Sequence, residues 1–413
     1  MSRRGAYLAL AAVAALPRLA ALAVERGEIL VQYVDKSDAF AQTLVESGTF
    51  GFVDGHPSAY TQPLYGWFLS AVYWVAGREW PAVGIAQIAV AVATSLLVYE
   101  LGRRFLSPAA GLVAAVLATL HPYLVWHDVH LNREILDQLA AAAVALLLTA
   151  ALARPTPVLA AGLGGALGVA ILGNARLALL PALAVGLLLW AHRRRALAAS
   201  VVVVVACGLV VAPWVARNAA VVGCPAITTD ARALWKANNE NTYETLAGGR
   251  WIDQVPDPPG APPSPQDAWE RYRETGVLVE VDECGQMEDY QERVLEFWRE
   301  HPGEKGRLAA QSAGFLWQPW VMRTEGRSNQ GSAVDRLRDW VEPAYMIPIY
   351  ALALLGLARV PRRFAVVAVT LLAYQTLVAM IFVGTTRYRT PWDFLLTLLA
   401  AGALVQLWER RRR

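Results

Sequence analysis

Long apolar runs alternate along this chain with short polar loops, and most of the runs approach the length needed to cross a bilayer. A hydrocarbon core of about 30 Å needs roughly 20 helical residues. Ten runs qualify as candidate spans: 6–24, 80–101, 108–124, 135–153, 158–172, 177–190, 196–215, 343–358, 364–383 and 391–407. The pattern predicts an all-α polytopic membrane protein with about ten transmembrane helices and additional juxtamembrane helices.

Arginine clusters in every second loop fix the expected orientation of these spans. Basic residues favour cytoplasmic loops. With ten spans, all the clusters fall on one side and both termini are cytoplasmic: Arg3 and Arg4, Arg103 and Arg104, Arg154, Arg193 to Arg195, Arg359 with Arg362 and Arg363, and Arg410 to Arg413. The first apolar run is interpreted as a retained span, because no convincing small-residue cleavage site follows it.

One further apolar run, 64–76, is too short to span. If it crossed the membrane, Arg103 and Arg104 would move to the outer side. We therefore expect an interfacial or re-entrant helix on the outer face. A tilted eleventh span is the alternative.

Composition agrees with a membrane protein. The chain is 56% hydrophobic and 17% charged, with mean hydropathy +0.35. Soluble globular domains carry more charge. The net charge of +3 carries little information, because the charges are segregated among the loops.

The loops divide the chain into three expected parts. Residues 1–218 form an N-terminal transmembrane catalytic module whose first outer loop is 25–79. Residues 219–341 form an extracytoplasmic loop region with juxtamembrane helices, and residues 342–413 form the C-terminal transmembrane helices. No internal repeat is evident.

Within the large outer region, the proline-rich stretch 256–265 predicts a loop or linker. An amphipathic helix is predicted beyond it, ending at His301-Pro302, from four apolar residues at helical spacing: Tyr290, Val294, Phe297 and Trp298. Cys224 and Cys284 both lie in this region, facing an oxidising compartment. We expect them to form a disulfide; two unpaired thiols too far apart to meet are the alternative.

The first outer loop carries two carboxylates, Asp35 and Asp38, just beyond the first span. The segment after Ser37 is expected to be a capped helix with Asp38 in its first turn, because Phe40 and Leu44 are four residues apart. Either carboxylate could be a general base at the membrane surface or a solvated helix cap.

The second outer loop is rich in histidine and acid, with His121, His127, Asp128, His130 and Glu134. Such residues can bind a metal, but their spacing is not diagnostic of a metal site. Glu134 opens a membrane helix, where a carboxylate is favoured by the helix dipole. Both a capping role and a functional role therefore fit Glu134.

Several arginines lie on the outer side, against the topology rule. They are Arg176, Arg217, Arg387 and Arg389. The planar guanidinium fork matches phosphate oxygens, so converging arginines predict an anionic ligand.

Six motifs together resemble the GT-C membrane glycosyltransferases, in the branch of protein O-mannosyltransferases and the lipid A aminoarabinose transferase (glycosyltransferase family 39-like). The likeness covers most of the chain. The motifs are Asp35 to Leu44 with Phe40 and Ala41, Pro63-Leu64-Tyr65, Leu101-Gly102-Arg103-Arg104, Pro213 to Asn218, Leu234 to Asn239 with Asn238, and Arg387 to Pro391. Two departures stand out: Lys36 follows Asp35 where the family usually shows a second acid, and Phe40 replaces a tyrosine.

The resemblance implies a polyprenyl-phosphate sugar donor and inverting transfer outside the cytoplasm to a lipid, glycan or protein acceptor. Asp35 would be the base, with Asp38 as the alternative, and Glu134 would be a supporting or acceptor-side residue. Arg176, Arg217, Arg387 and Arg389 would bind the donor phosphate, and four further residues would contact substrate: Tyr65, Asn218, Asn238 and Asn239. No cofactor is firmly implied, a divalent metal is left open, and a nucleic acid partner is not expected.

Two other functional classes compete with this one. A transporter or flippase of lipid-linked sugar should place ionisable groups near the bilayer midplane. The predicted spans contain few, which favours the enzyme. A non-catalytic assembly protein would tolerate Asp35→Asn without loss of glycan product.

Overall fold

The computed structural model describes residues 2–31, 35–321 and 333–412. These parts of the chain are built from helices and loops, with one isolated antiparallel bridge between Val53 and His56. The expected all-α polytopic fold is therefore confirmed. Portions of both large outer segments, at 32–34 and 322–332, lie outside the described residues.

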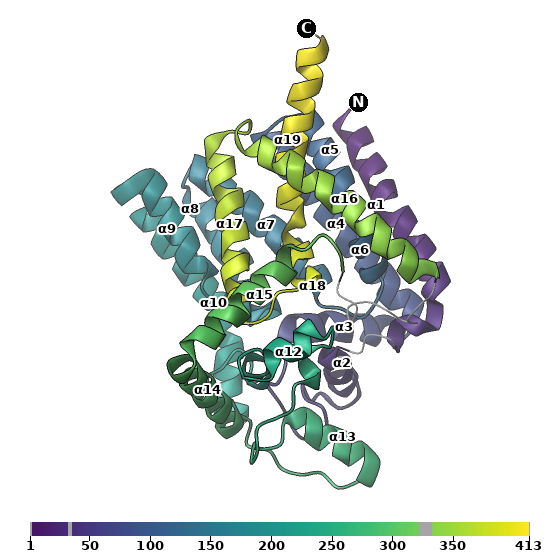
Figure 1. Cartoon of the computed structure of the whole chain (residues 1–413), viewed down its shortest axis with the longest axis vertical. Coiled ribbons are helices and arrows are strands. Elements are labelled where there is room, and N and C mark those ends of the chain that lie inside the picture. Colours follow the sequence, from purple (N-terminus) through teal and green to yellow (C-terminus); the bar gives the residue numbers. More distant parts are fainter. Residues whose placement is uncertain (1, 32–34, 322–332, 413) are drawn as a thin grey trace.

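Each of the ten apolar runs contains most or all of one long helix (Figure 1), although the run 108–124 is divided between α5 and the short α6 (Pro122–His127). These helices are α1 (Arg3–Glu25), α4 (Trp80–Phe105), α5 (Pro108–Thr119), α7 (Glu134–Ala153), α8 (Pro157–Gly173), α9 (Leu180–His192), α10 (Leu197–Val221), α16 (Ala333–Leu357), α17 (Arg362–Ile381) and α19 (Asp393–Arg412). Seven stretches of the described chain are long and apolar enough to span a membrane, and one of them, Ala175–Val221, contains both α9 and α10. The remaining two helices, α5 and α8, are shorter and apolar. Helix α16 begins ten residues before the expected start at 343.

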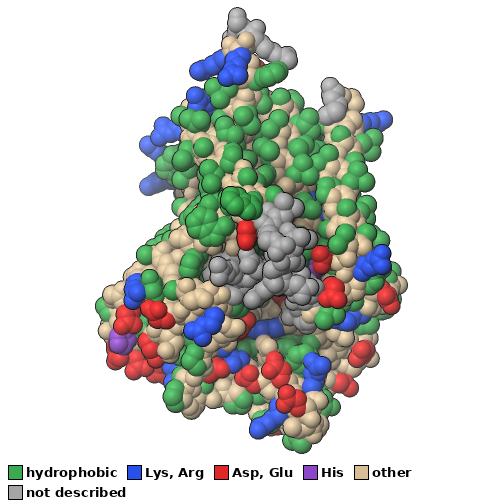
Figure 2. All heavy atoms as spheres, turned by 45° about the vertical axis from the view of Figure 1, so that its right-hand side comes forward, with side chains coloured by type: hydrophobic (Ala, Val, Ile, Leu, Met, Phe, Trp, Pro, Cys, Tyr) green, Lys and Arg blue, Asp and Glu red, His purple; other side chains and the backbone are tan. Residues whose placement is uncertain are grey.

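Hydrogen bonds between helix ends show how the bundle alternates in direction. At one end, Tyr7 near the start of α1 donates to Glu100 near the end of α4 at 2.6 Å. Gln406 near the end of α19 donates at 2.8 Å to the carbonyl of Arg359, just beyond α16. Both termini lie at this end in Figure 1. Apolar side chains cover this half of the molecule in Figure 2, and acidic side chains concentrate in the other half.

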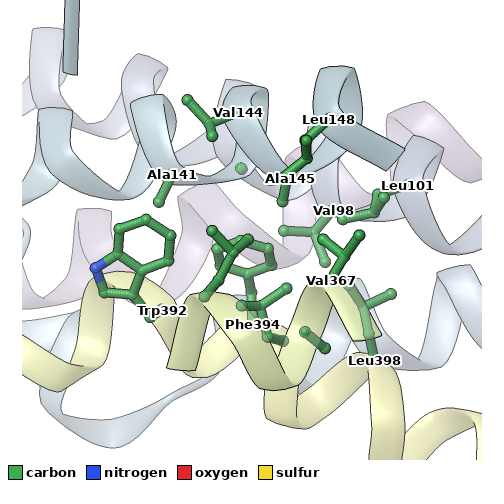
Figure 3. Packing of buried hydrophobic residues seen from close by; sticks show 14 of the residues in the cluster. Val98, Leu101, Ala141, Val144, Ala145, Leu148, Val367, Trp392, Phe394 and Leu398 are labelled. Atoms are coloured by element: carbon green, nitrogen blue, oxygen red, sulfur yellow. The ribbon is translucent and has the colours of Figure 1, made fainter. Parts of the chain in front are cut away.

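Small residues allow a close helix contact between α8 and α10. A Cβ added at Gly164 would lie 2.4 Å from the carbonyl oxygen of Val203, and one at Gly168 would lie 3.0 Å from that of Cys207. Close backbone approach of this kind is how membrane helices gain packing energy without a hydrophobic driving force. Helices α4, α7, α17 and α19 contribute to one buried hydrophobic cluster, with Trp392 just ahead of α19. Figure 3 labels ten of its residues: Val98, Leu101, Ala141, Val144, Ala145, Leu148, Val367, Trp392, Phe394 and Leu398.

The remaining elements gather at the end of the bundle opposite the termini (Figure 1). They include α2 (Lys36–Ser47), α3 (Pro63–Ala76), α6 (Pro122–His127), α11 (Arg232–Lys236), α12 (Thr242–Ala247), α13 (Pro265–Thr275), α14 (Glu283–Glu300), α15 (Pro302–Trp317) and α18 (Thr386–Arg389). Short 3-10 turns join them: η1 (Arg26–Leu30), η2 (Ala175–Leu177), η4 (Ile252–Gln254) and η5 (Thr390–Trp392), with η3 (Arg193–Ala196) at the other end.

Helix α3 corresponds to the short aromatic run and has 14 residues. It is not among the stretches long enough to span. Its buried face, with Tyr65, Leu69 and Tyr73, packs against α2 and α4. Its contact with α2, at the end of the bundle opposite the two termini, agrees with the interpretation that α3 does not span the membrane.

The outer region contains the predicted amphipathic helix and the predicted disulfide. Tyr290, Val294 and Phe297 are buried along α14, which ends before Pro302. Cys224 and Cys284 are bonded, with their Cα atoms 5.9 Å apart. The bridge ties the start of α14 to the segment that follows α10.

A buried ion pair anchors the first span to the segment between α6 and α7. Arg18 of α1 lies 2.7 Å from Asp128 and also donates to the carbonyl of Thr119 at 2.9 Å. Gln138 donates to the second carboxylate oxygen of Asp128 at 3.0 Å. Paired and fully hydrogen-bonded charges of this kind are tolerated in apolar surroundings. The pair joins α1 to the segment before α7.

Candidate active site

A cavity of about 370 Å³ opens at the end of the bundle away from the termini. Its volume lies in the range of small-molecule sites. Its walls come from the first outer loop, the starts of α7 and α9, the outer region and the segment around α18. The charged residues that line it are Asp35, Lys36, Arg133, Arg176, Asp230, Asp253 and Arg387.

Asp35 has one carboxylate oxygen engaged in the backbone and the other directed toward a cation. Its Oδ1 accepts from the amide of Ser37 at 2.9 Å, so Asp35 is the N-cap of α2. The helix therefore begins at Lys36, earlier than the expected start after Ser37. Its Oδ2 lies 4.0 Å from Nη2 of Arg387. Asp35 is thus a carboxylate at a helix N-terminus that lines the cavity.

Asp38, the alternative base, does not line the cavity. Tyr73 donates to its Oδ1 at 2.6 Å, and Arg78 donates to both of its oxygens at 3.0 and 2.8 Å. Gln42 adds a fourth hydrogen bond at 3.1 Å. Burial, reinforced by the Asp38 charge, raises the pKa of Tyr73. Asp38 is therefore buried in contacts that fasten α2 to α3.

Glu134 is buried behind the cavity between two arginines. Arg387 donates to its Oε1 at 2.7 Å, and Nε of Arg133 lies 3.7 Å from the same oxygen. Arg133 also donates to Gln62 at 2.6 Å. One carboxylate thus supports two guanidinium groups at the cavity wall, which lets two like charges approach each other. Glu134 also opens α7, as expected.

Arg176 lies in η2 and stacks on two aromatic rings. Its guanidinium carbon lies 4.2 Å from the ring centre of Tyr388 and 4.8 Å from that of Phe382. Its carbonyl accepts from Tyr374 at 2.8 Å. Stacking on aromatic faces orients a guanidinium while leaving its N–H groups available in the plane. Arg176 therefore presents a cation to the cavity from the side of α17.

Lys36 and Asp230 form an ion pair across the cavity. Nζ of Lys36 lies 2.7 Å from Oδ2 of Asp230 and 4.3 Å from the ring centre of Tyr60. Burial lowers the pKa of Lys36, but the charge and hydrogen bond of Asp230, together with Tyr60, outweigh burial, so the pKa is raised. Burial raises the pKa of Asp230, but the charge and hydrogen bond of Lys36, together with the amide of Ala233, outweigh burial, so the pKa is lowered. Both groups are thus held in their charged forms.

Two of the four expected phosphate ligands lie outside the cavity lining. Arg217 donates to the carbonyls of Ser58 and Phe50 at 3.0 and 3.1 Å and to Oδ1 of Asn218 at 2.9 Å. It therefore braces the first outer loop against the end of α10.

Arg389 is buried and directed toward other helices. It pairs with Asp393 at 3.0 Å and donates to the carbonyls of Leu316 and Gln318 at 2.9 and 2.6 Å. Its contacts join α18 to α15 and α19. Arg176 and Arg387 are the two expected arginines that line the cavity.

The expected substrate contacts also have internal partners. Tyr65 donates to Gln87 at 2.7 Å, and Asn218 donates to the carbonyl of Ala226 at 2.7 Å. Both residues are buried and neither lines the cavity.

Asn238 and Asn239 are likewise buried away from the cavity lining. Asn238 donates to the carbonyl of Leu234 at 2.7 Å and accepts from Lys305 at 2.6 Å. Asn239 donates to the carbonyl of Trp235 at 3.0 Å. These amides bond to carbonyls of α11, and two residues of that helix, Ala233 and Leu234, line the cavity.

The histidines of the second outer loop have separate partners. His121 lies 3.3 Å from Asp393, and His130 lies 3.6 Å from Glu25. Within the described residues, no group of three or more histidine, cysteine or acidic side chains is placed to hold a metal ion.

Sequence reasoning missed Arg133 as a cavity residue, although a signal was present. Arg133 is a basic residue on an outer loop and precedes Glu134, so the argument applied to Arg176 selects it as well. Asp230 carried no comparable signal, because its role depends on a contact with Lys36 across 194 positions of sequence.

Comparisons with known proteins agree with the motifs. Residues 56–216 match the family model of dolichyl-phosphate-mannose-protein mannosyltransferases. No curated protein sequence gives a significant match.

Among solved structures, the archaeal oligosaccharyltransferase AglB from Archaeoglobus fulgidus, in complex with an inhibitory peptide and a dolichol-phosphate, is similar over 98% of this chain. The TM-score is 0.56 and the identity 12%. This chain spans half the length of that AglB chain. ArnT from Cupriavidus metallidurans bound to undecaprenyl phosphate aligns over 98% of this chain and 79% of its own, with TM-score 0.45 and 12% identity. The family match over residues 56–216 agrees with the resemblance predicted from the motifs, and the similarity to AglB confirms the GT-C fold.

Proposed function

We propose that this protein is a membrane glycosyltransferase that moves a sugar from a polyprenyl-phosphate donor to a hydroxyl acceptor outside the cytoplasm, with inversion. The observation that carries the proposal is the cavity in which Asp35 faces Arg387 while Arg133 and Arg176 line the same walls. A carboxylate and several guanidinium groups in one cavity of this size support the assignment of a base and a phosphate site to it.

The reaction needs a proton acceptor for the attacking hydroxyl and an anion site for the leaving phosphate. Asp35 takes the proton from the acceptor hydroxyl as its oxygen attacks the anomeric carbon. The bond from that carbon to the phosphate oxygen breaks, and polyprenyl phosphate leaves as an anion. Attack opposite the leaving group inverts the anomeric centre.

Three arginines supply the anion site. Arg133, Arg176 and Arg387 stabilise the charge that grows on the leaving phosphate. Glu134 keeps Arg133 and Arg387 in place without entering the cavity lining. Since aromatic rings hold Arg176, its N–H groups need little reorganisation when phosphate binds.

Two observations support an extracytoplasmic site in a plasma membrane protein. The Cys224–Cys284 bridge lies on the same end of the bundle as the cavity, and disulfides persist in oxidising compartments. The arginine-rich loops lie at the opposite end, where the positive-inside rule places the cytoplasm.

The decisive experiment supplies the purified protein, in lipid nanodiscs, with a panel of labelled polyprenyl-phosphate sugars and hydroxyl acceptors. Transfer of label, release of polyprenyl phosphate and inverted stereochemistry support the proposal. Movement of labelled lipid between leaflets of proteoliposomes without sugar transfer identifies a flippase instead. The same panel run with Asp35→Asn assigns the base.

A further inference from the structure

Lys36 places a positive charge directly beside the proposed base. It directly follows Asp35 in the sequence. An ammonium on a flexible four-carbon stem could fold back onto the neighbouring carboxylate and neutralise it. In the structure it reaches Asp230 instead, at 2.7 Å.

Asp230 is held in place to receive this cation. Its Oδ1 accepts from the amide of Ala233 at 3.3 Å, which leaves Oδ2 for Lys36. The amide of Asp230 donates to Oγ1 of Thr228 at 3.3 Å. The backbone next to Asp230 is also fixed, because the amide of Thr229 donates to the carbonyl of Ala59 at 3.0 Å. The position of Asp230 is thus set by the backbone of two outer segments.

The aromatic ring of Tyr60 is a second contact of the Lys36 ammonium. Nζ of Lys36 lies 4.3 Å from the ring centre, and Tyr60 itself is buried. A cation over an aromatic face is attracted electrostatically. Lys36 is therefore drawn in one direction by both Asp230 and Tyr60, while Oδ2 of Asp35 is directed at Arg387.

We propose that Lys36 and Asp230 are positioning residues, in which Asp230 binds the Lys36 ammonium and thereby keeps the Asp35 carboxylate available for the acceptor proton. The pair also joins the start of α2 to the outer region. This inference rests on the proposed function, since it assigns Asp35 the role of base.

Loss of Asp230 and loss of Lys36 should have different effects on the basicity of Asp35. This difference distinguishes positioning residues from residues that only stabilise the fold. Without Asp230, the ammonium becomes a second cation beside Asp35, in addition to Arg387. Each cation near a carboxylate makes it a weaker base. Without Lys36, no ammonium is present to occupy Asp35. Removal of both should therefore be less harmful than removal of Asp230 alone.

The kinetic test compares Lys36→Met, Asp230→Asn and the double variant. We expect Asp230→Asn to lower kcat by about tenfold with a change in donor KM of less than about threefold, and the double variant to regain the kcat of Lys36→Met. A double variant no more active than Asp230→Asn overturns the proposal. Asp230→Glu, which keeps the counter-ion, should retain most of the wild-type kcat.

A second measurement does not depend on transferase activity. Zero-length carbodiimide coupling of the wild-type protein in nanodiscs, followed by peptide mass spectrometry, should give a Lys36–Asp230 isopeptide. Absence of this product, with other buried ion pairs coupled in the same sample, overturns the pairing even if Asp230→Asn fails to fold. A coupled pair in a protein that transfers no sugar would instead refute the proposed function and leave the ion pair standing.

Discussion

Arg387 donates a hydrogen bond of 2.7 Å to the buried carboxylate of Glu134, across 253 positions of sequence. The contact joins α18 to the first turn of α7. The same guanidinium lies 4.0 Å from Asp35. Through Arg387, the N-terminal and C-terminal parts of the chain together build the wall of the cavity.

Asp35→Asn should abolish sugar transfer without unfolding the protein. Asparagine caps helices about as well as aspartate, so α2 keeps its N-terminal hydrogen bond. Loss of a general base typically lowers kcat by about 10²–10⁴-fold. The checks are kcat, donor binding and the thermal unfolding temperature. A variant that retains transfer would remove Asp35 from the reaction.

Asp38→Asn should behave in the opposite way, with a lower unfolding temperature and a smaller loss of kcat per folded molecule. The substitution leaves Arg78 without its carboxylate partner and weakens the contact with Tyr73. Thermal unfolding and active-fraction measurements decide the matter. Full stability combined with complete loss of transfer would exchange the roles assigned to the two aspartates.

Arg176→Ala should raise the donor KM by about tenfold or more, because a charge-assisted contact to phosphate is worth about 1.5–3 kcal/mol. Its carbonyl contact with Tyr374 is unaffected by the side chain. The unfolding temperature should change little. Steady-state kinetics with varied donor measure the effect, and an unchanged KM would exclude Arg176 from phosphate binding.

Arg217→Ala is the matched comparison, since Arg217 lies outside the cavity lining. Two loop carbonyls, those of Ser58 and Phe50, lose their donor. We expect a lower unfolding temperature and greater protease sensitivity of the first outer loop, with donor KM close to wild type. A KM change equal to that of Arg176→Ala would contradict this assignment.

Reduction of the Cys224–Cys284 bridge should destabilise the outer region by about 4 kcal/mol, since a cross-link of this span restricts the unfolded chain. The bond encloses a sequence separation of 60 residues. Thermal unfolding with and without reductant provides the measurement, with Cys224→Ser/Cys284→Ser as the genetic equivalent. Mass spectrometry of unreduced, alkylated protein should show one linked peptide.

Orientation can be tested with single cysteines at exposed positions of opposite ends of the bundle. A cysteine at Ser47 should react with an impermeant maleimide in intact cells, and one at Arg194 only after permeabilisation. The native Cys207 is buried and should stay unlabelled. The reverse pattern would place the cavity in the cytoplasm.

Local sequence determined most of the fold. Apolar runs, helical periodicity and helix-breaking residues are local features of the sequence. The ten apolar runs and the amphipathic α14 were therefore recognisable from it. Arginine clusters also predicted the shared end of the two termini, because that rule depends only on loop composition. The two outer cysteines were recognisable as candidates, and their proximity was decided by the fold.

The roles within the site depended on contacts that sequence cannot measure. Asp35 and Asp38 are three residues apart, yet Tyr73 and Arg78 enclose Asp38, while Asp35 lines the cavity. The outer arginines were equivalent by composition. Tertiary packing commits Arg217 and Arg389 to carbonyls and to Asp393, and leaves Arg176 and Arg387 at the cavity.

The physical reason is the range of the interactions. Helix formation and membrane insertion follow from neighbouring residues, so the sequence alone predicts which segments are helical and which ends they share. A charged side chain must find its partner in three dimensions, and the partner can be hundreds of positions away, as Glu134 is from Arg387. The sequence thus determined the bundle, and only the tertiary structure decided which charges meet in the cavity.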